Sequence, residues 1–373
     1  MADSCIVNLA RTMVHYSTRV QPHDRVAIVG APVSEPLMKE VFREVLRAGG
    51  YPYPMLGLEI LAGMDGLDEI YFAEANEDQL KHVLQTEYMV RTEFEVMILL
   101  KSQGNTHSRS NVDPAKVQMW KKARSEMAET FLKRSADGLA RWALTLYPTQ
   151  AYAQDADMGL EEFRDYVYRT TFSDQPDPIA EWNKLHDEQQ VIVDWLNGRK
   201  DVVVEGPNID MNLSIDGRTF INSDGTKNMP SGEVFTGPVE DSAEGWVKFT
   251  YPAIYEGREV AGVELKFEKG RVVQASAEKN EEFLIAMLDM DEGSRCLGEF
   301  AIGTNKMIDR FIKNILFDEK IGGTIHMALG MGYPETGSVN KSAIHWDMIC
   351  DMREDSRILV DGDLLYENGE FKI

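Results

Sequence analysis

Residues 24–56, "DRVAIVGAPVSEPLMKEVFREVLRAGGYPYPML", decide the fold class of the first half of the chain. "DRVAIVG" (24–30) is a short apolar run that ends in glycine, and it predicts a buried strand. "SEPLMKEVFREVLRAGG" (34–50) predicts a helix that has Ser34 as its N-cap and a glycine pair as its stop. "YPYPML" (51–56) returns to extended structure. A strand–helix–strand unit of this kind implies parallel strands joined by a right-handed crossover.

The alternation of strands and helices continues through the first half. Apolar runs predict strands over 95–102 and 141–149, and apolar residues at helical spacing predict helices over 113–137 and 159–196. The junction "VGAPVSEP" (29–36) lacks the GxGxxG spacing that lets backbone approach a pyrophosphate, so no nucleotide site is predicted there. The first half is therefore interpreted as an α/β domain with a mainly parallel sheet.

The second half has the texture of a β-rich α+β domain. From about residue 200, short alternating runs are separated by "DG", "EGRE", "EKGR" and "ENGE" turns, which indicate a series of hairpins. Helices are predicted to interrupt them at 279–290 and 305–317. This change of pattern predicts two domains, an α/β domain over 1–198 and a β-rich domain over 199–373.

Composition limits the classes of partner. The 373 residues carry a formal net charge of −23, so nucleic acid and anionic membrane surfaces would repel the chain. Cys5, Cys296 and Cys350 lie far apart and form no CxxC pattern, which fits a reducing compartment. The N-terminal segment has no continuous apolar run and no basic region, so no signal peptide is predicted. No stretch approaches the about 18 uninterrupted apolar residues of a membrane span. We therefore expect a cytoplasmic protein.

Acidic and imidazole side chains in apolar settings are the candidates for chemistry in the second half. "SAIHWDMICD" (342–351) places His345 and Asp347 on the same side of a strand, because strand side chains alternate with period two. The pair is either a core histidine bonded to a carboxylate or one edge of a metal site. The other candidates in apolar or glycine-rich surroundings are Glu233, Glu299, Glu319, His326 and Tyr333.

Each candidate also has an ordinary structural explanation. A single buried-looking glutamate usually reaches water at an edge or turn, and a lone histidine on an apolar face is more often a hydrogen-bonded core residue. Burying several such groups together is costly unless they share a partner. Four carboxylates and two imidazoles suit two divalent cations with some shared ligands, as in a cocatalytic site for hydrolysis.

Four segments of the second half resemble the aminopeptidase S/T family of thermophilic dinuclear metallo-aminopeptidases. They are "NMPSGEVFTGPVEDSAEG" (228–245), "LGEFAIGTN" (297–305), "LFDEKIGGTIHMALGMGYPETG" (316–337) and "SAIHWDMICDMR" (342–353). The resemblance is specific over residues 200–373, and in the first half it is one of general α/β texture.

The resemblance implies a set of site residues and a function. The metal ligands would be Glu233, Glu299, Glu319, His326, His345 and Asp347. Among them Glu299 and Asp347 would be shared by two ions (Zn, Co or Mn), and Glu319, which lies further from His326 in sequence than the family leads us to expect, would stand at the edge of the pocket. Tyr333 and Glu299 would be catalytic. The family implies a homodimer that releases N-terminal amino acids from short peptides with a free N-terminus. In it, the domain over 1–198 would enclose the cleft, and the domain over 199–373 would be the metal-binding catalytic domain.

A rival interpretation comes from another reaction class. His326, His345 and Asp347 alone form a two-histidine-one-carboxylate set, the facial triad of mononuclear non-haem Fe(II) oxygenases. Ring-cleaving dioxygenases of dihydroxypyridines resemble the same aminopeptidase scaffold. This alternative predicts that Glu233, Glu299 and Glu319 point away from the metal.

Overall fold

The computed structural model describes residues 3–56, 64, 66–110, 112–255 and 257–373. The chain forms two compact units. Unit 1 comprises Met1–Trp182 and Gly225–Pro230, and unit 2 comprises Asn183–Asp224 and Ser231–Ile373. The chain passes from unit 1 to unit 2 between Trp182 and Asn183, within the helix that precedes residue 198. The domain boundary at residue 198 stays a prediction.

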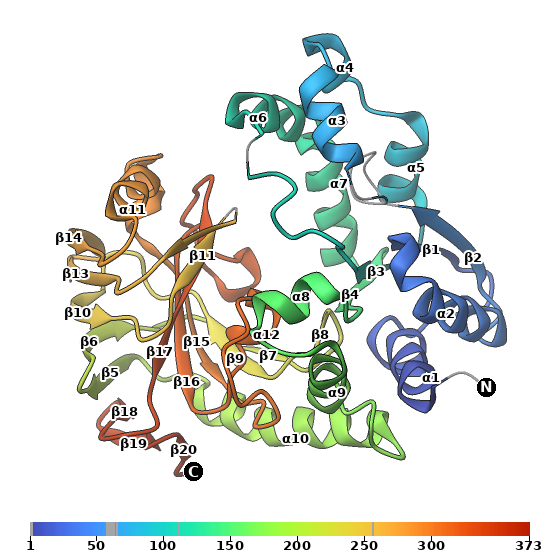
Figure 1. Cartoon of the computed structure of the whole chain (residues 1–373). Coiled ribbons are helices and arrows are strands. Elements are labelled where there is room, and N and C mark those ends of the chain that lie inside the picture. Colours follow the sequence, from blue (N-terminus) through green and yellow to red (C-terminus); the bar gives the residue numbers. More distant parts are fainter. Residues whose placement is uncertain (1–2, 57–63, 65, 111, 256) are drawn as a thin grey trace. The chain divides into compact units, whose positions relative to one another are not determined.

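Unit 1 alternates strands and helices along the chain (Figure 1). Its strands pair in the order β2-β1-β3-β4-β8, all in parallel, which confirms the predicted α/β fold class. Its elements are α1 (Ser4–Arg11), the π-helix η1 (Thr12–Ser17), β1 (Arg25–Gly30), η2 (Pro32–Ser34), α2 (Glu35–Arg47), β2 (Tyr51–Leu56), α3 (Leu67–Glu74), α4 (Glu77–Lys81), α5 (Gln85–Glu93), β3 (Val96–Lys101), α6 (Pro114–Ala123), α7 (Ser125–Ala136), β4 (Arg141–Leu146), α8 (Gln150–Asp155), α9 (Leu160–Thr170) and β8 (Asn228–Met229).

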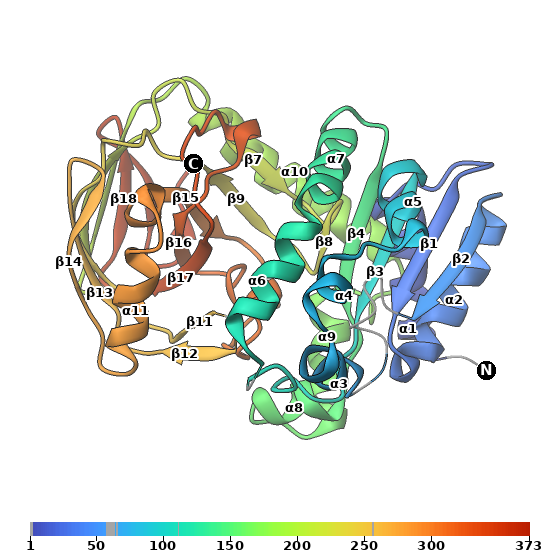
Figure 2. The ribbon, with the colours of Figure 1, turned by 90° about the horizontal axis from the view of Figure 1, so that it is seen from above.

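Helices cover both faces of the parallel sheet (Figure 2). On one face, Val90 of α5 and Phe131 of α7 pack in one apolar cluster with Ala27 and Met97 of the central strands. The other face carries α2, which packs against β1 and β2. Ser34 precedes α2 as predicted, but its hydroxyl does not cap the helix, because it donates to the carbonyl of Ala31 at 2.8 Å.

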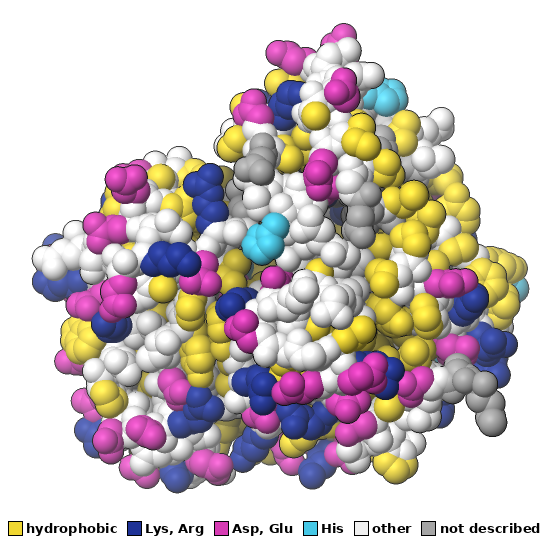
Figure 3. Space-filling model, in the orientation of Figure 1, with side chains coloured by type: hydrophobic (Ala, Val, Ile, Leu, Met, Phe, Trp, Pro, Cys, Tyr) yellow, Lys and Arg dark blue, Asp and Glu magenta, His cyan; other side chains and the backbone are white. Residues whose placement is uncertain are grey.

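The strand β2 ends the order of this sheet, and its side chains are largely exposed. The amide of Tyr51 donates to the carbonyl of Asp24 at 2.7 Å. Because the direction of backbone groups alternates along a strand, those of Tyr51 and Tyr53 point toward β1, and those of Pro52 and Pro54 point away from it. Figure 3 shows hydrophobic side chains gathered around this strand and α5. Tyr51 and Tyr53 remain 57% and 48% exposed.

Unit 2 is built of antiparallel sheets. Its strands follow the orders β14-β13-β10-β6-β5-β18-β19-β20, β17-β16-β15-β9-β7 and β11-β12. The elements, with the helix α10 that enters from unit 1, are α10 (Pro178–Leu196), β5 (Asp201–Gly206), β6 (Ile209–Ser214), β7 (Ile221–Ser223), β9 (Glu233–Thr236), β10 (Glu244–Lys248), β11 (Ala253–Tyr255), β12 (Arg258–Val260), β13 (Glu264–Glu268), β14 (Arg271–Ser276), α11 (Glu281–Leu288), η3 (Glu292–Arg295), β15 (Leu297–Gly303), α12 (Ile315–Asp318), β16 (Thr324–Gly330), η4 (Pro334–Thr336), β17 (His345–Asp351), β18 (Arg357–Val360), β19 (Asp363–Glu367) and β20 (Glu370–Phe371).

The sheet β17-β16-β15-β9-β7 has two chemically different faces. Phe300, Met327 and Trp346 are fully buried in the apolar core of unit 2, together with other alternate residues of these strands. The intervening residues, such as His326 and Glu299, belong to the opposite face. One face therefore anchors the sheet in the core, and the other presents polar groups from rigid strands.

Two long predicted helices are each interrupted. The segment 113–137 forms α6 and α7, with a break at Arg124, whose φ of −105° and ψ of −1° leave the helix. The segment 159–196 forms α9 and α10, separated by a stretch that contains Pro176 and ends at Pro178. Both segments are helical as predicted, but neither is one helix.

Among the described residues, no helix is both long and apolar enough to cross a membrane.

The predicted helix over 305–317 is wrong, because only α12, a four-residue helix, forms in this region. Asn305 uses its side chain to accept from the Met307 amide, and the Asp318 carboxylate accepts from the amides of Ile312 and Asn314. These side chains satisfy amides that a helix would have bonded internally. The apolar periodicity of the segment therefore serves packing rather than helix formation.

Candidate metal centre

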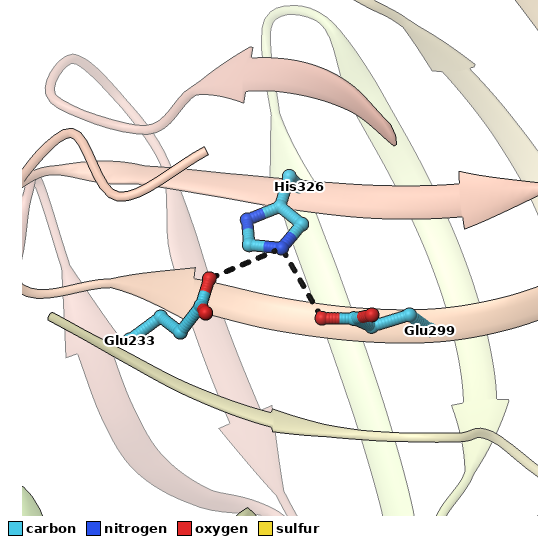
Figure 4. Close-up of side chains that lie close together, drawn as sticks. All are labelled: Glu233, Glu299 and His326. Atoms are coloured by element: carbon cyan, nitrogen blue, oxygen red, sulfur yellow. Dashed lines mark hydrogen bonds and ion pairs between the residues drawn. The ribbon is translucent and has the colours of Figure 1, made fainter. Parts of the chain in front are cut away.

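Three neighbouring strands bring Glu233, Glu299 and His326 together (Figure 4). In the register of the sheet, Ala301 of β15 pairs with His326 of β16, and Gly303 pairs with Glu233 of β9. The His326 Nε2 atom lies 3.3 Å from Glu299 Oε1 and 3.5 Å from Glu233 Oε2. All three side chains are buried. A strand pairing that is common in any antiparallel sheet thus concentrates two carboxylates on one imidazole.

The fourth strand, β17, adds His345 and Asp347 on the same face. Asp347 pairs in register with Ala328, two residues from His326, so His326 and Asp347 lie on one face of the sheet. The His345 Nε2 atom lies 3.3 Å from Glu299 Oε2 and 3.4 Å from Asp347 Oδ1. The His345 Nδ1 atom donates to the Met331 carbonyl at 2.7 Å, because a carbonyl oxygen can only accept. That bond directs Nε2 toward the carboxylates, as the outer partner of a metal-bound histidine does.

Glu319 enters the same cluster from the end of α12, and Lys320 follows it. Lys320 is completely buried, forms an ion pair with Glu319, and places its Nζ atom 3.8 Å from Glu233 Oε1. Sequence reasoning missed Lys320, because a lysine beside a glutamate at a helix end is normally solvated. The only local signal was its position between an apolar helix and the glycine pair Gly322 and Gly323.

The two imidazoles are electrically held in their charged forms by the carboxylates around them. Burial disfavours a charged His326, but Glu299 and Glu233 outweigh it and raise the pKa of His326 to about 9. Burial acts on His345 in the same sense, and Asp347 and Glu299 raise its pKa well above the ordinary value. In the absence of a metal, the His326 and His345 rings therefore carry protons at places in the cluster where a cation is favoured.

The carboxylates divide into two kinds. Burial opposes ionisation of Glu299 and Asp347, but the facing imidazoles lower the pKa of both, that of Asp347 to about 2. Glu319 behaves differently, because burial and the charge of Glu233 together raise its pKa to about 7 in spite of Lys320. For Lys320 itself, burial lowers the pKa, and the charges of Glu233 and Glu319 more than reverse this. The cluster holds more negative charge than its own cations balance.

Tyr333 lies beside the cluster on the segment between β16 and β17. Its ring packs edge-on against His345 at 5.0 Å between centroids and against Phe235 at 5.6 Å. Burial, and then the charges of Glu299 and Asp347, raise the pKa of Tyr333, so its hydroxyl stays protonated and able to donate.

Two carboxylates fasten the segment that carries Tyr333. Glu240 accepts from the Ser338 hydroxyl at 3.1 Å and from the Val339 amide at 2.8 Å. Asp291 accepts from the Ser342 hydroxyl and the Ala343 amide at 3.0 and 2.7 Å. Burial opposes ionisation of both, but these bonds leave their pKa values below normal. The aromatic side chain therefore sits on a braced segment rather than on a free loop.

The cluster suits divalent cations in both donor type and spacing. Three triads each offer ligand atoms within 4.8 Å of one another, namely Glu233–Glu299–His326, Glu299–His345–Asp347 and Glu319–His326–Asp347. Within the described residues, Glu233 Oε2 has no hydrogen-bond donor, although a buried polar atom normally has one. Carboxylate oxygens and imidazole nitrogens are ligands that zinc, cobalt and manganese accept. All six residues expected as ligands lie in this cluster, and their role as ligands stays a prediction.

Comparison with known sequences places the chain among peptidases. The model of a family described as thermophilic metalloprotease (M29) matches residues 2–371. Aminopeptidase 2 of Geobacillus stearothermophilus is 31% identical over 274 residues, which are 64% of this chain and 66%, just under two thirds, of that protein. Aminopeptidase T of Thermus thermophilus is 28% identical over 304 residues, 73% of each chain.

Solved structures show the same fold at lower identity. Wild-type AmpT from Thermus thermophilus superposes with a TM-score of 0.85 at 21% identity, over 99% of each chain. A 2,5-dihydroxypyridine dioxygenase from Pseudomonas putida KT2440 superposes with a TM-score of 0.60 at 14% identity, over 100% of this chain and 98% of that one. With a family match over nearly its whole length and a carboxylate–imidazole cluster on the sheet, the chain belongs to the thermophilic metalloprotease (M29) family.

Proposed function

We propose that the protein is a metal-dependent aminopeptidase that releases N-terminal amino acids from short peptides at a site for two divalent ions. The observation that carries this proposal is the overlap of the three triads, since Glu299 and Asp347 each belong to two of them. A carboxylate has two oxygens and can serve two neighbouring ions, as cocatalytic hydrolases require. The similarity to aminopeptidases 2 and T supports the substrate class.

The residues of the cluster would have different roles in hydrolysis. A bound divalent ion would lower the pKa of a water from 15.7 toward ~7 and polarise the scissile carbonyl. Glu299 and Asp347 would hold ions in common, and His345, fixed by the Met331 carbonyl, would present a preset nitrogen. The protonated Tyr333 hydroxyl would donate to the carbonyl oxygen, where negative charge develops in the transition state.

A mononuclear iron(II) ring-cleaving dioxygenase that uses His326, His345 and Asp347 is the second candidate. The shared fold with a dihydroxypyridine dioxygenase favours it. It has weaker support because it expects the glutamates to point away, whereas Glu233 and Glu299 both face the His326 Nε2 atom within 3.5 Å (Figure 4).

Metal content and substrate choice test the proposal together. The full-length protein is analysed for bound metals and then assayed on unblocked and N-acetylated dipeptides. Two divalent ions per chain (Zn, Co or Mn) and hydrolysis of the unblocked peptides alone are the expected results. One iron per chain with oxygen-dependent cleavage of a dihydroxypyridine would replace the peptidase with the dioxygenase.

Two further expectations belong to the same proposal. The family resemblance implies a homodimer, which sedimentation of the full-length protein checks. The acidic composition and the scattered free cysteines Cys5, Cys296 and Cys350 favour a reducing, cytoplasmic location, which fractionation of cells checks.

A further inference from the structure

A lysine with no exposed surface stands inside the proposed metal site. The Lys320 side chain is 0% exposed, forms an ion pair with Glu319, and lies 3.8 Å from a Glu233 oxygen. Lysine is almost never fully buried unless its charge is paired. Two of the four carboxylates of the cluster, Glu233 and Glu319, are thus paired with a cation that the chain itself supplies.

The contacts of Lys320 are not spread evenly over the three triads. Its carboxylate partners are Glu233, which belongs to the triad with Glu299 and His326, and Glu319, which belongs to the triad with His326 and Asp347. The third triad, Glu299–His345–Asp347, contains neither ion-pair partner, and Lys320 acts on it through a weaker electrostatic interaction with Asp347.

Figure 4 shows how two of the carboxylates lie about the His326 ring. Glu233 and Glu299 approach the His326 ring from different sides, and only Glu233 is an ion-pair partner of Lys320. One side of the cluster therefore contains a lysine charge that remains when a metal binds, whereas the cation of the other side is the His345 imidazole, which loses its proton to become a ligand.

An ammonium and a metal ion interfere when they use the same carboxylates. Both need the negative charge of Glu233 or Glu319, and two cations a few Å apart repel each other strongly in a buried site. With neutral imidazoles, four carboxylates and Lys320 carry three negative charges. A first divalent ion leaves one negative charge, and a second turns the total positive. Without Lys320, the second ion would bring the same residues only to neutrality.

We propose that Lys320 makes the two metal positions unequal in affinity. Glu299, His345 and Asp347 bind the tight ion, and the position built from Glu319 or Glu233 binds the second ion weakly, because Lys320 competes for its carboxylates. Lys320 acts as a built-in cation that holds Glu233 and Glu319 together when the second ion is absent. This inference rests on the proposed two-ion site and adds the order in which that site fills.

The test is a titration of the chelated full-length protein with Co²⁺, in which calorimetry and visible absorption measure the binding. Lys320→Met removes the charge and keeps an unbranched chain of similar length. Lys320→Gln is the second neutral variant, and it retains a donor toward Glu319 in case the methionine variant fails to fold. Lys306→Met is the matched control, because Lys306 pairs with Glu370 at the exposed surface.

We expect wild type to bind Co²⁺ in two classes that differ at least tenfold in dissociation constant. The neutral variants should tighten the weak class tenfold or more and change the tight class less, while Lys306→Met behaves as wild type. A wild type that takes one ion, with neutral variants that take two, would support the same conclusion.

Equal classes in wild type, or a weak class that stays unchanged or loosens in the neutral variants, would overturn the inference. So would equal tightening in Lys306→Met, which would indicate a general charge effect. The proposed function fails by a different observation, the absence of dipeptide hydrolysis when two ions are bound, and that result leaves the order of affinities measurable.

Discussion

Buried charge is arranged in opposite ways in the two units. In unit 1, Arg124 and Glu87 are each about 96% buried and form a matched pair, with Nε to Oε1 at 2.9 Å. The guanidinium also donates to the carbonyls of Leu80 and His82 and lies over the Trp120 ring. The pair contains one positive and one negative charge, and its donors have partners.

The cluster of unit 2 is not balanced in this way. Four carboxylates face two imidazoles and one ammonium, and an oxygen of Glu233 lacks a donor among the described residues. A structural ion pair is complete without any other molecule, whereas a surplus of buried carboxylate needs a cation from outside. The difference teaches that the balance of buried charge, rather than its presence, separates a site from a structural pair.

The largest expected effect comes from His345→Ala. If His345 is a ligand, hydrolysis of unblocked dipeptides should fall by roughly 10³-fold or more, because the metal-activated water is the nucleophile. The chelated variant should also unfold at a lower temperature than chelated wild type, because the charged imidazole no longer faces Asp347 and Glu299, so activity is the readout that separates a ligand from a structural histidine. His186→Ala is the matched control, since His186 also bonds a carboxylate, Asp224, at 2.8 Å. A large loss of stability with activity retained would show that His345 is a hydrogen-bonded core histidine and not a metal ligand.

The balanced pair should show the reverse pattern in Glu87→Gln. The change leaves the Arg124 charge buried without its counter-charge, which should destabilise the protein by about 3–5 kcal/mol in denaturant unfolding. Activity per folded molecule should not change. The exposed Glu77–Lys81 pair supplies the control, and Glu77→Gln should leave the unfolding midpoint in place. Unchanged stability in Glu87→Gln would break the comparison between the units.

The pH dependence of chelated protein should sharpen the comparison next. The folded pKa of His326, about 9, lies above the ordinary 6.5, so its contribution to stability is complete below about pH 6.5 and is lost as pH rises through 9. The loss should be roughly 3 kcal/mol. Metal binding requires neutral His326, so Co²⁺ affinity should rise over the same range. The prediction would be contradicted by a free energy of unfolding that does not change between pH 6.5 and 9. It would also be contradicted by a pH dependence of stability that is the same in a His326→Gln variant.

The smallest effect of the series should be the difference between Lys320→Met and wild type in their response to metal removal. Ions bound at 100 times their dissociation constant stabilise the folded state by about 2.7 kcal/mol per site. Chelation should therefore lower the melting temperature, and restored Co²⁺ should recover it. Lys320→Met should lose more on chelation than wild type, since no internal cation then offsets its carboxylates. An identical response of both proteins would argue that Lys320 is not part of the charge balance.

Much of the fold was predictable from local pattern. The strand–helix–strand unit at 24–56 and the hairpins of the second half follow from apolar periodicity and turn residues, which act over a few residues. The break at Arg124 was not predictable, because its cause is a buried pair with Glu87, distant in sequence. For the same reason β8, at Asn228–Met229, could not be assigned to the sheet of unit 1.

The candidate site was predictable as a group of residues and not as a charge distribution. Carboxylates and histidines in apolar surroundings carry a local signal, so Glu299 and His345 stand out in the sequence. Lys320 carries only a weak local signal, its position between a short helix and a glycine pair, because lysine is usually solvated and tertiary packing is what buries it. What sequence could not supply was the cation that comes with the carboxylates.

The prolines of β2 have a consequence for how the protein behaves in a crowded solution. A strand at the end of a sheet offers its free backbone groups to the edge strands of other chains, which is a common start of aggregation. By the same alternation, Pro52, Pro54 and Leu56 are the residues of β2 whose backbone groups face away from β1, and the two prolines have no N–H to offer. An incoming strand would find acceptors there but no donors over those two positions. The exposed Tyr51 and Tyr53 can therefore stand at this margin without making it a template for fibres.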